Sequence, residues 1–89
     1  MIHELKILPS FYEDVIQHRK TFEVRKNDRP YAVGDFLILH EYTPDKGYSG
    51  RAVEVPVIYI LNDIRYCKPD FIIMGLGFPK TPTFNLVHL

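Results

Sequence analysis

The chain has 89 residues and a formal net charge of zero, with 46% hydrophobic and 25% charged residues. These values predict one globular domain and exclude a disordered or low-complexity chain. Zero net charge argues against a protein that binds polyanions over its whole surface, but it is compatible with a local basic groove. Cys67 is the one cysteine, which excludes an intrachain disulfide and favours a reducing compartment.

The N-terminal segment has neither a basic start nor a long apolar core, so we expect no signal peptide. The wholly apolar runs are far shorter than the roughly 20 residues needed to span a bilayer. We therefore expect a cytoplasmic protein without a membrane partner. The sequence gives no expectation for the oligomeric state.

Alternating apolar and polar side chains predict a first strand over residues 2–8, which Pro9 ends. Ser10 followed by Glu13 matches a capping box at the start of a helix. We expect that helix over residues 11–18, with apolar side chains four positions apart. A helix of about eight residues is not stable alone, so it must pack on the rest of the domain.

Residues 21–26 read as a second strand with two distinct faces. Phe22 and Val24 share one face, which we expect to enter the core. Glu23 and Arg25 share the other face, which we expect to point outwards or into a cleft.

Further strands are expected over residues 36–42, 51–61 and 70–78, with a turn-rich loop over residues 43–50. Alternate side chains from Val53 through Tyr59 to Leu61 would share one face. Pro56 removes a backbone donor, so we expect an edge or a bulge there. Residues 79–89 are expected either to add a short edge strand or to form a loosely attached tail.

This order of elements predicts an α+β, mostly β domain with one short helix after the first strand. Short strands separated by turns favour a small β-barrel, since closure removes exposed edges. The helix would then cover one end of the barrel.

The sequence gives no reason to expect a metal ion or a cofactor. The four histidines, His3, His18, His40 and His88, lack the spacing of known metal motifs. Gly75 and Gly77 lie in an apolar strand that leads to no helix, so they do not form a phosphate-binding loop. A neighbouring Lys68 is a single weak cue for a reactive thiol at Cys67.

Residues 18–35 hold five of the eleven Lys and Arg residues: Arg19, Lys20, Arg25, Lys26 and Arg29. Lys20 lies at the junction of the predicted helix and the second strand, where its side chain can reach the Glu23 and Arg25 face. Thr21 adds a hydroxyl on that same face. Since a guanidinium group binds phosphate or carboxylate through paired donors, this set predicts a pocket for a nucleotide.

The segment HRKTFEVR resembles the signature Gly-x-Lys-x-x-Glu-x-Arg of the ASCH domain, a member of the PUA-like superfold. Lys20, Glu23 and Arg25 fill its three polar positions, and His18 stands where the family usually has glycine. Glycine at that position suggests a positive φ or a close approach by a ligand. The segments HELK, FEVRKNDR, GD and GYSGR extend the resemblance over residues 2–78, to a small bacterial and phage subfamily of unknown function.

The resemblance implies that residues 1–89 form one ASCH/PUA-like domain, a β-barrel with a helix at the motif and an RNA-binding cleft. We therefore expect an RNA- or nucleotide-binding module. Its cations would hold phosphate, Glu23 would orient Arg25 or read a base edge, and a tyrosine would stack on a base. The expected ligand-binding residues are Lys20, Thr21, Glu23, Arg25, Lys26, Arg29, Tyr31 and Tyr48.

Two alternatives stay open at this stage. Some small bacterial ASCH proteins resemble amidohydrolases that remove the acetyl group from acetylated cytidine. Such an enzyme would use Lys20 and Glu23 as catalytic residues, although Glu23 stands where those proteins have a threonine nucleophile. Alternatively, the chain is a protein-interaction module in which Glu23 and Arg25 form a structural ion pair.

Overall fold

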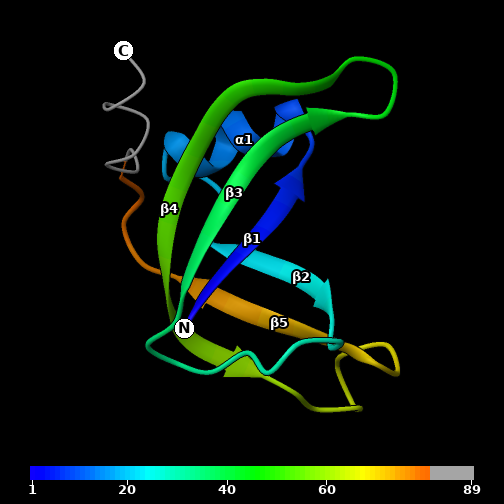
Figure 1. The fold of residues 1–89 in the computed structure, drawn as a ribbon. Coiled ribbons are helices and arrows are strands. Elements are labelled where there is room, and N and C mark those ends of the chain that lie inside the picture. The colour runs from blue at the N-terminus through cyan, green and yellow to red at the C-terminus, as the bar shows by residue number, and fades with distance from the viewer. Residues whose placement is uncertain (81–89) are drawn as a thin grey trace.

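The computed structural model describes residues 1–80 of the chain. Its elements in chain order are β1 (Ile2–Ile7), α1 (Pro9–Ile16), β2 (Phe22–Lys26), β3 (Phe36–Thr43), β4 (Gly47–Leu61) and β5 (Phe71–Leu76) (Figure 1). Within the described residues, the five strands form a mixed sheet in the order β1-β3-β4-β5-β2. β1 runs parallel to β3, and the other pairs are antiparallel. The prediction of a mostly β domain with one short helix after the first strand is confirmed.

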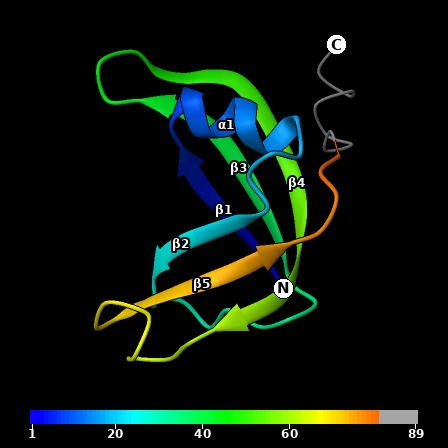
Figure 2. The same ribbon diagram turned by 180° about the vertical axis from the view of Figure 1, so that it is seen from behind.

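The sheet is not closed, so the expected barrel is not confirmed. β1 and β2 are the two edges of the strand order. β4 serves both halves of the sheet, because it pairs with β3 up to Pro56 and with β5 from Val57 onwards. In Figures 1 and 2, β2 and β5 cross β1 and β3 as a second layer, and α1 lies at one end of β3.

The core lies inside this folded-over sheet. It takes its buried side chains from β1, α1, β3, β4 and β5: Leu5, Ile7, Tyr12, Val15, Leu37, Leu39, Val53, Val55, Val57, Ile72, Met74 and Leu76. β1 alternates exposed and buried positions throughout, which confirms the predicted period of two. The alternation along β1 therefore places Leu5 and Ile7 in the core.

The start of α1 differs from the prediction. The helix begins at Pro9, and Leu8 is its N-cap residue in an extended conformation without a side-chain cap. Proline suits the first helical position because its φ is preset and its missing N–H group would have no helical partner there. The capping box proposed for Ser10 is therefore wrong, and the helix lies two residues nearer the N-terminus than expected.

The end of α1 explains the unusual histidine of the motif. His18 has a φ of 58°, the left-handed conformation that glycine commonly supplies after a helix. The His18 N–H donates to the carbonyl of Val15 (2.9 Å), and the Arg19 N–H donates to the carbonyl of Asp14 (2.8 Å). This pair of bonds is the Schellman motif. The His18 ring also stacks on Phe78, with 4.4 Å between ring centroids.

The two faces of β2 are the reverse of the prediction. Glu23 is 3% exposed, whereas Phe22 is 46% and Val24 51% exposed. A carboxylate is tolerated on the inner face only when charged partners hold it, and Glu23 has two. The exchange of faces therefore creates a buried ionic cluster beside the helix end.

β4 begins at Gly47 rather than Arg51, so the predicted loop is a tighter hairpin than expected. Pro56 is not on an edge strand, because β4 lies between β3 and β5. A register shift occurs between Val57 and Tyr59. This irregularity changes which side chains face inwards, and Tyr59 is 62% exposed instead of sharing the buried face of Val57.

The end of the described chain continues alongside β4. Lys80 forms an isolated antiparallel bridge with Glu54, and both backbone hydrogen bonds of the pair measure 2.8–2.9 Å. The prediction for the tail otherwise falls on residues 81–89, outside the described residues.

A buried carboxylate ties the chain start to the turn before β3. The N-terminal amine of Met1 donates to Asp35 Oδ1 (3.0 Å), and His3 Nε2 lies 2.8 Å from Asp35 Oδ2. The Ala32 N–H donates to the same Oδ2 at 3.0 Å. The hydrogen bond with His3, followed by that from the N-terminal amine, lowers the pKa of Asp35 from 3.8 to about 2.

We expect Asp35→Asn to flatten the acid part of the stability curve. The folded state holds this carboxylate at a pKa below its unfolded value, so its contribution is complete above about pH 4. It is then lost as the pH falls through about 2. Thermal unfolding from pH 2 to pH 7 should show a shallower acid decline of Tm in Asp35→Asn than in the wild type. An Asp28→Asn control at an exposed position should keep the wild-type profile, and parallel profiles for all three proteins would contradict the assignment.

Candidate functional site

The three polar residues of the motif form one ionic cluster. Lys20 Nζ donates to Glu23 Oε1, and Arg25 Nε donates to Glu23 Oε2 at 2.7 Å. The side chains of Lys20 and Arg25 are only 15% and 23% exposed. Glu23 therefore fixes the positions of two cations from opposite sides of its carboxylate.

A pocket of about 370 Å³ opens beside this cluster, and we call it the motif pocket. Its lining residues used below are Lys6, Phe11, Lys20, Phe22, Glu23 and Arg25. Phe11 and Phe22 are 47% and 46% exposed. Lys20 Nζ lies 5.6 Å from the centroid of the Phe11 ring and 5.0 Å from that of the Phe22 ring. The motif pocket thus combines a held ammonium group with two accessible aromatic rings.

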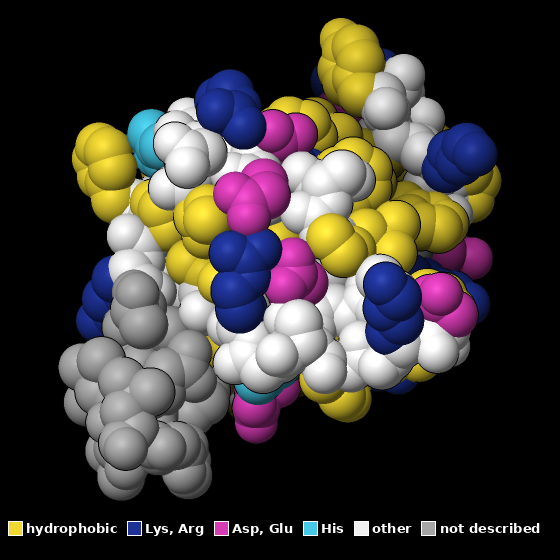
Figure 3. Space-filling view, turned by 90° about the horizontal axis from the view of Figure 1, so that it is seen from above, with side chains coloured by type: hydrophobic (Ala, Val, Ile, Leu, Met, Phe, Trp, Pro, Cys, Tyr) yellow, Lys and Arg dark blue, Asp and Glu magenta, His cyan; other side chains and the backbone are white. Residues whose placement is uncertain are grey.

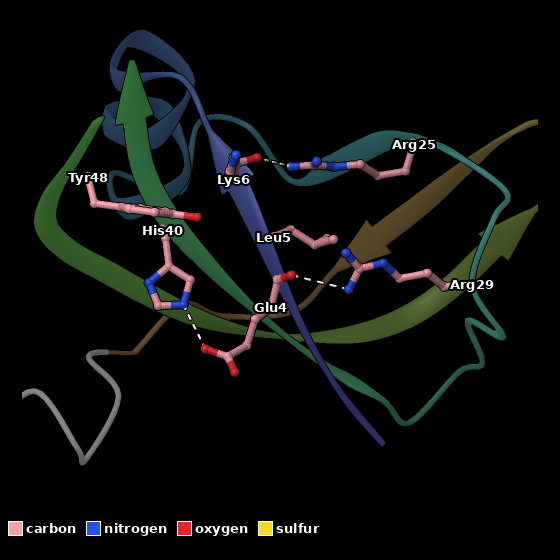
Figure 4. A pocket seen from close by; sticks show the side chains of 7 residues that line it. All are labelled: Glu4, Leu5, Lys6, Arg25, Arg29, His40 and Tyr48. Atoms are coloured by element: carbon pink, nitrogen blue, oxygen red, sulfur yellow. Dashed lines mark hydrogen bonds and ion pairs between the residues drawn. The ribbon is translucent and has the colours of Figure 1, made fainter. Parts of the chain in front are cut away.

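A larger hollow of about 710 Å³ lies along β1, and we call it the seam groove. Its polar lining residues are Glu4, Lys6, Arg25, Arg29, His40 and Tyr48. Figure 4 shows Arg25 and Arg29 reaching β1 from one side, with His40 and Tyr48 on the other. The groove therefore brings together side chains from β1, β2, β3, β4 and the loop that follows β2.

Two arginines cross the gap between the edge strands. Arg25 Nη2 donates to the Lys6 carbonyl (2.7 Å), and Arg29 Nη1 donates to the Glu4 carbonyl (3.2 Å) (Figure 4). These contacts use one terminal nitrogen of each guanidinium group. Since guanidinium carries five N–H donors, each arginine retains donors beyond the bonds named here.

The opposite wall of the seam groove is aromatic. Lys6 Nζ lies 4.3 Å from the centroid of the Tyr42 ring and 5.8 Å from that of the Tyr48 ring. Tyr48 is 60% exposed, and its ring contacts Tyr42 edge-on at a centroid distance of 5.0 Å. His40 Nε2 lies 2.9 Å from Glu4 Oε1. The wall therefore presents an accessible ring beside a cation.

The structure brings Lys20, Glu23, Arg25, Arg29 and Tyr48 to these two adjoining hollows. The other sequence-predicted site residues, Thr21, Lys26 and Tyr31, do not line either one.

Thr21 and Lys26 differ from Tyr31 in their surroundings. Thr21 and Lys26 are exposed, and the Thr21 carbonyl accepts the N–H of Leu76 at 2.9 Å. The Tyr31 ring packs against His3 with 4.6 Å between ring centroids. Burial raises the pKa of Tyr31 despite the nearby Arg29 and Arg25 charges. A stacking role for Tyr31 therefore has no geometric support here.

Four residues that line the two hollows were not predicted from the sequence: Glu4, Lys6, Phe11 and His40. The alternation along β1 does carry a signal for two of them, because it places Glu4 and Lys6 on the face opposite the core. No local pattern brings β1 next to Arg25 and Arg29, which are separated from their carbonyl partners by 19 and 25 positions.

A second ionic cluster, in which Glu41 is buried and Arg51 is half exposed, links α1 to the sheet. Arg51 donates to both oxygens of Glu41 and to Glu13 on α1, and its guanidinium lies 4.5 Å from the Tyr12 ring centroid. Hydrogen bonds from Arg51 and from Ser49 lower the pKa of Glu41.

Seen from above, basic and acidic side chains alternate across the surface (Figure 3). The charges on that face are mixed, unlike the cation-rich wall of the seam groove.

No group of three or more His, Cys, Asp or Glu side chains suited to a metal ion occurs among residues 1–80. His88 lies outside that range. Over the same part of the chain, no helix has the length and apolar character needed to cross a membrane. Cys67 is buried, and its thiol lies 3.6 Å from the Leu61 carbonyl.

Comparisons with known proteins give a family but no activity. Residues 2–76 match the profile of the family described as "Domain of unknown function (DUF3850)". A relative from Escherichia phage P2, named "Uncharacterized 12.9 kDa protein in GpA 3'region", is 34% identical over 73 residues. The match covers 82% of this chain and 65% of the relative, so the chain spans less than two thirds of the relative's length.

Proposed function

Because this chain belongs to the DUF3850 family, a domain of unknown function, we propose its function from its own geometry: it is an RNA- or nucleotide-binding module. The observation that carries this proposal is the seam groove, where Lys6, Arg25 and Arg29 lie along a β-strand edge beside Tyr48. Cations that contact phosphate and a ring that stacks on a base are the two elements of sequence-tolerant nucleic-acid binding.

The held position of Arg25 supports phosphate recognition. Glu23 and the Lys6 carbonyl fix two of its nitrogens, so little side-chain freedom is lost when a ligand binds. Arg29 is exposed and contacts β1 two residues away from the Arg25 contact, at the Glu4 carbonyl. Two guanidinium groups spaced along one edge suit the repeating phosphates of a nucleic-acid strand.

We further propose that the domain is an ASCH domain of the PUA-like superfold. The supporting observations are the joint position of Lys20, Glu23 and Arg25 and the positive φ of His18 at the usual glycine position. Arg25 and Arg29 also span the gap between β1 and β2, the two edges that would have to meet in a barrel.

The test is direct binding of the full chain to a pool of fluorescently labelled single-stranded RNA oligonucleotides, followed by anisotropy at increasing salt. We expect measurable affinity at low salt and a linear fall of log K with log salt, because phosphate contacts release counterions. Undetectable binding at low salt, with the protein folded, would refute the proposed function.

A hydrolase acting on an acetylated nucleoside is the second candidate, favoured by the contact between Lys20 and Glu23 in the motif pocket. Among residues 1–80, none that lines this pocket carries a hydroxyl or thiol nucleophile. The reaction would therefore need Lys20 or Glu23 to activate water. Acetate release from N-acetylcytidine that is lost in Lys20→Ala would favour this candidate over binding alone.

A protein-interaction role is the third candidate. It rests on exposed apolar side chains of the sheet, among them Phe22, Val24 and Tyr59. Recovery of one protein partner by the wild type and equally by Arg29→Ala, without RNA affinity, would favour this role.

A further inference from the structure

We propose that the two hollows act together on one ligand, a single-stranded nucleic-acid segment that crosses β1 and places one base in each hollow. This inference rests on the proposed function and goes beyond it, since it specifies a single strand longer than one nucleotide. One base stacks on Phe22 and Phe11 in the motif pocket, and another stacks on Tyr48 in the seam groove.

The two hollows adjoin because they share walls. Lys6 and Arg25 line both the motif pocket and the seam groove. The shared pair is cationic, and Arg25 is held against the Lys6 carbonyl at 2.7 Å. The phosphate that links two nucleotides would therefore lie along the wall that these two basic residues share.

Each hollow also has an accessible aromatic ring of its own. In the motif pocket, Phe11 and Phe22 flank Lys20 and are close to half exposed. In the seam groove, Tyr48 is 60% exposed and rests against Tyr42. Two aromatic sites that share a cationic wall match two bases and the phosphate that links them in a single strand.

The same geometry disfavours a duplex. Bases stacked inside a double helix present edges rather than faces to a protein, whereas these rings need an open base face. The volumes of about 370 and 710 Å³ fall within the range of about 300–1,000 Å³ usual for small-ligand sites. Each hollow thus has room for one nucleotide unit rather than a helix.

The test measures affinity against ligand length by isothermal titration calorimetry, with uridine monophosphate and uridine oligonucleotides of two and four residues. We expect at least a tenfold gain in affinity between the monophosphate and the oligonucleotides, because the second base adds its own stacking contact. An RNA duplex of four or more base pairs should bind at least tenfold more weakly than a single strand of the same length.

Three single variants assign the rings. Phe22→Ala and Tyr48→Ala should each weaken the tetranucleotide by about 5- to 150-fold, the usual effect of removing a stacking ring. Tyr66→Ala is the matched control, since Tyr66 is 70% exposed but lines neither hollow. In Phe22→Ala/Tyr48→Ala, the advantage of the tetranucleotide over the monophosphate should disappear.

The outcomes separate this inference from the function on which it rests. Equal affinity for the monophosphate and the tetranucleotide, or a Tyr48→Ala effect no larger than that of Tyr66→Ala, would overturn the two-base arrangement and leave nucleotide binding intact. A complete lack of affinity for every ligand would overturn both.

Discussion

Glu23→Gln should lower the free energy of unfolding by about 2–3 kcal/mol, because removing one partner of a buried ionic cluster leaves the others uncompensated. Glu23 is 3% exposed and bonds to both Lys20 and Arg25, so the neutral amide leaves two part-buried cations without their counter-charge. For a domain of this size the expected fall in Tm is about 10–20 °C. Thermal unfolding followed by circular dichroism measures it.

Glu4→Gln is the matched control for this change. Its carboxylate is 66% exposed and pairs with His40, so its loss should cost less than about 1 kcal/mol. The double variant Lys20→Gln/Glu23→Gln removes one of the orphaned cations and should regain part of the lost stability. Equal melting temperatures for Glu23→Gln and Glu4→Gln would show that the cluster contributes no more than a surface pair.

Glu23 shows which feature of this fold could not be predicted from the sequence. In β1, exposed and buried positions alternate without exception from Ile2 to Ile7, which agrees with the predicted period of two. In β2, the rule that apolar side chains face inwards gave the wrong face. The local sequence cannot show that Lys20 and Arg25 together compensate a buried Glu23, since that balance depends on the folded geometry.

The helix shows a similar limit at its start. Ser10 and Glu13 have capping-box spacing, but the helix begins two residues earlier than expected because Pro9 is itself favourable at the first helical position. At the helix end, by contrast, the glycine expected at position 18 did indicate a positive φ, and His18 adopts it. The backbone conformation required of one residue was therefore easier to predict than the choice between two residues at which the helix could begin.

Part of the candidate site could be predicted from the sequence and part could not. The spacing of Lys20, Glu23 and Arg25 indicated a shared hollow, because all three lie within six residues at one junction. The contribution of β1 was not predictable, since Arg25 and Arg29 reach backbone carbonyls that any residue type would supply. The larger hollow thus depends on tertiary contacts that leave no mark in residue identity.

Those contacts lead to the second large effect, on binding. Lys6→Ala/Arg29→Ala should weaken single-stranded RNA about 100-fold at low salt, equivalent to about 3 kcal/mol. Both side chains are exposed and line the seam groove, so the variant should fold while losing two phosphate contacts. Each lost contact should also reduce the slope of log K against log salt by about 0.7, or about 1.4 for the pair.

The slope is the more decisive of the two measurements, because lost affinity alone would also follow from a small change in groove shape. Lys46→Ala/Lys68→Ala removes the same formal charge at exposed positions outside the seam groove and the motif pocket. It should leave the slope close to the wild-type value. If both double variants reduced the slope equally, phosphate attraction would be a property of the overall charge, and the strand edge bridged by Arg25 and Arg29 would have no special part in it.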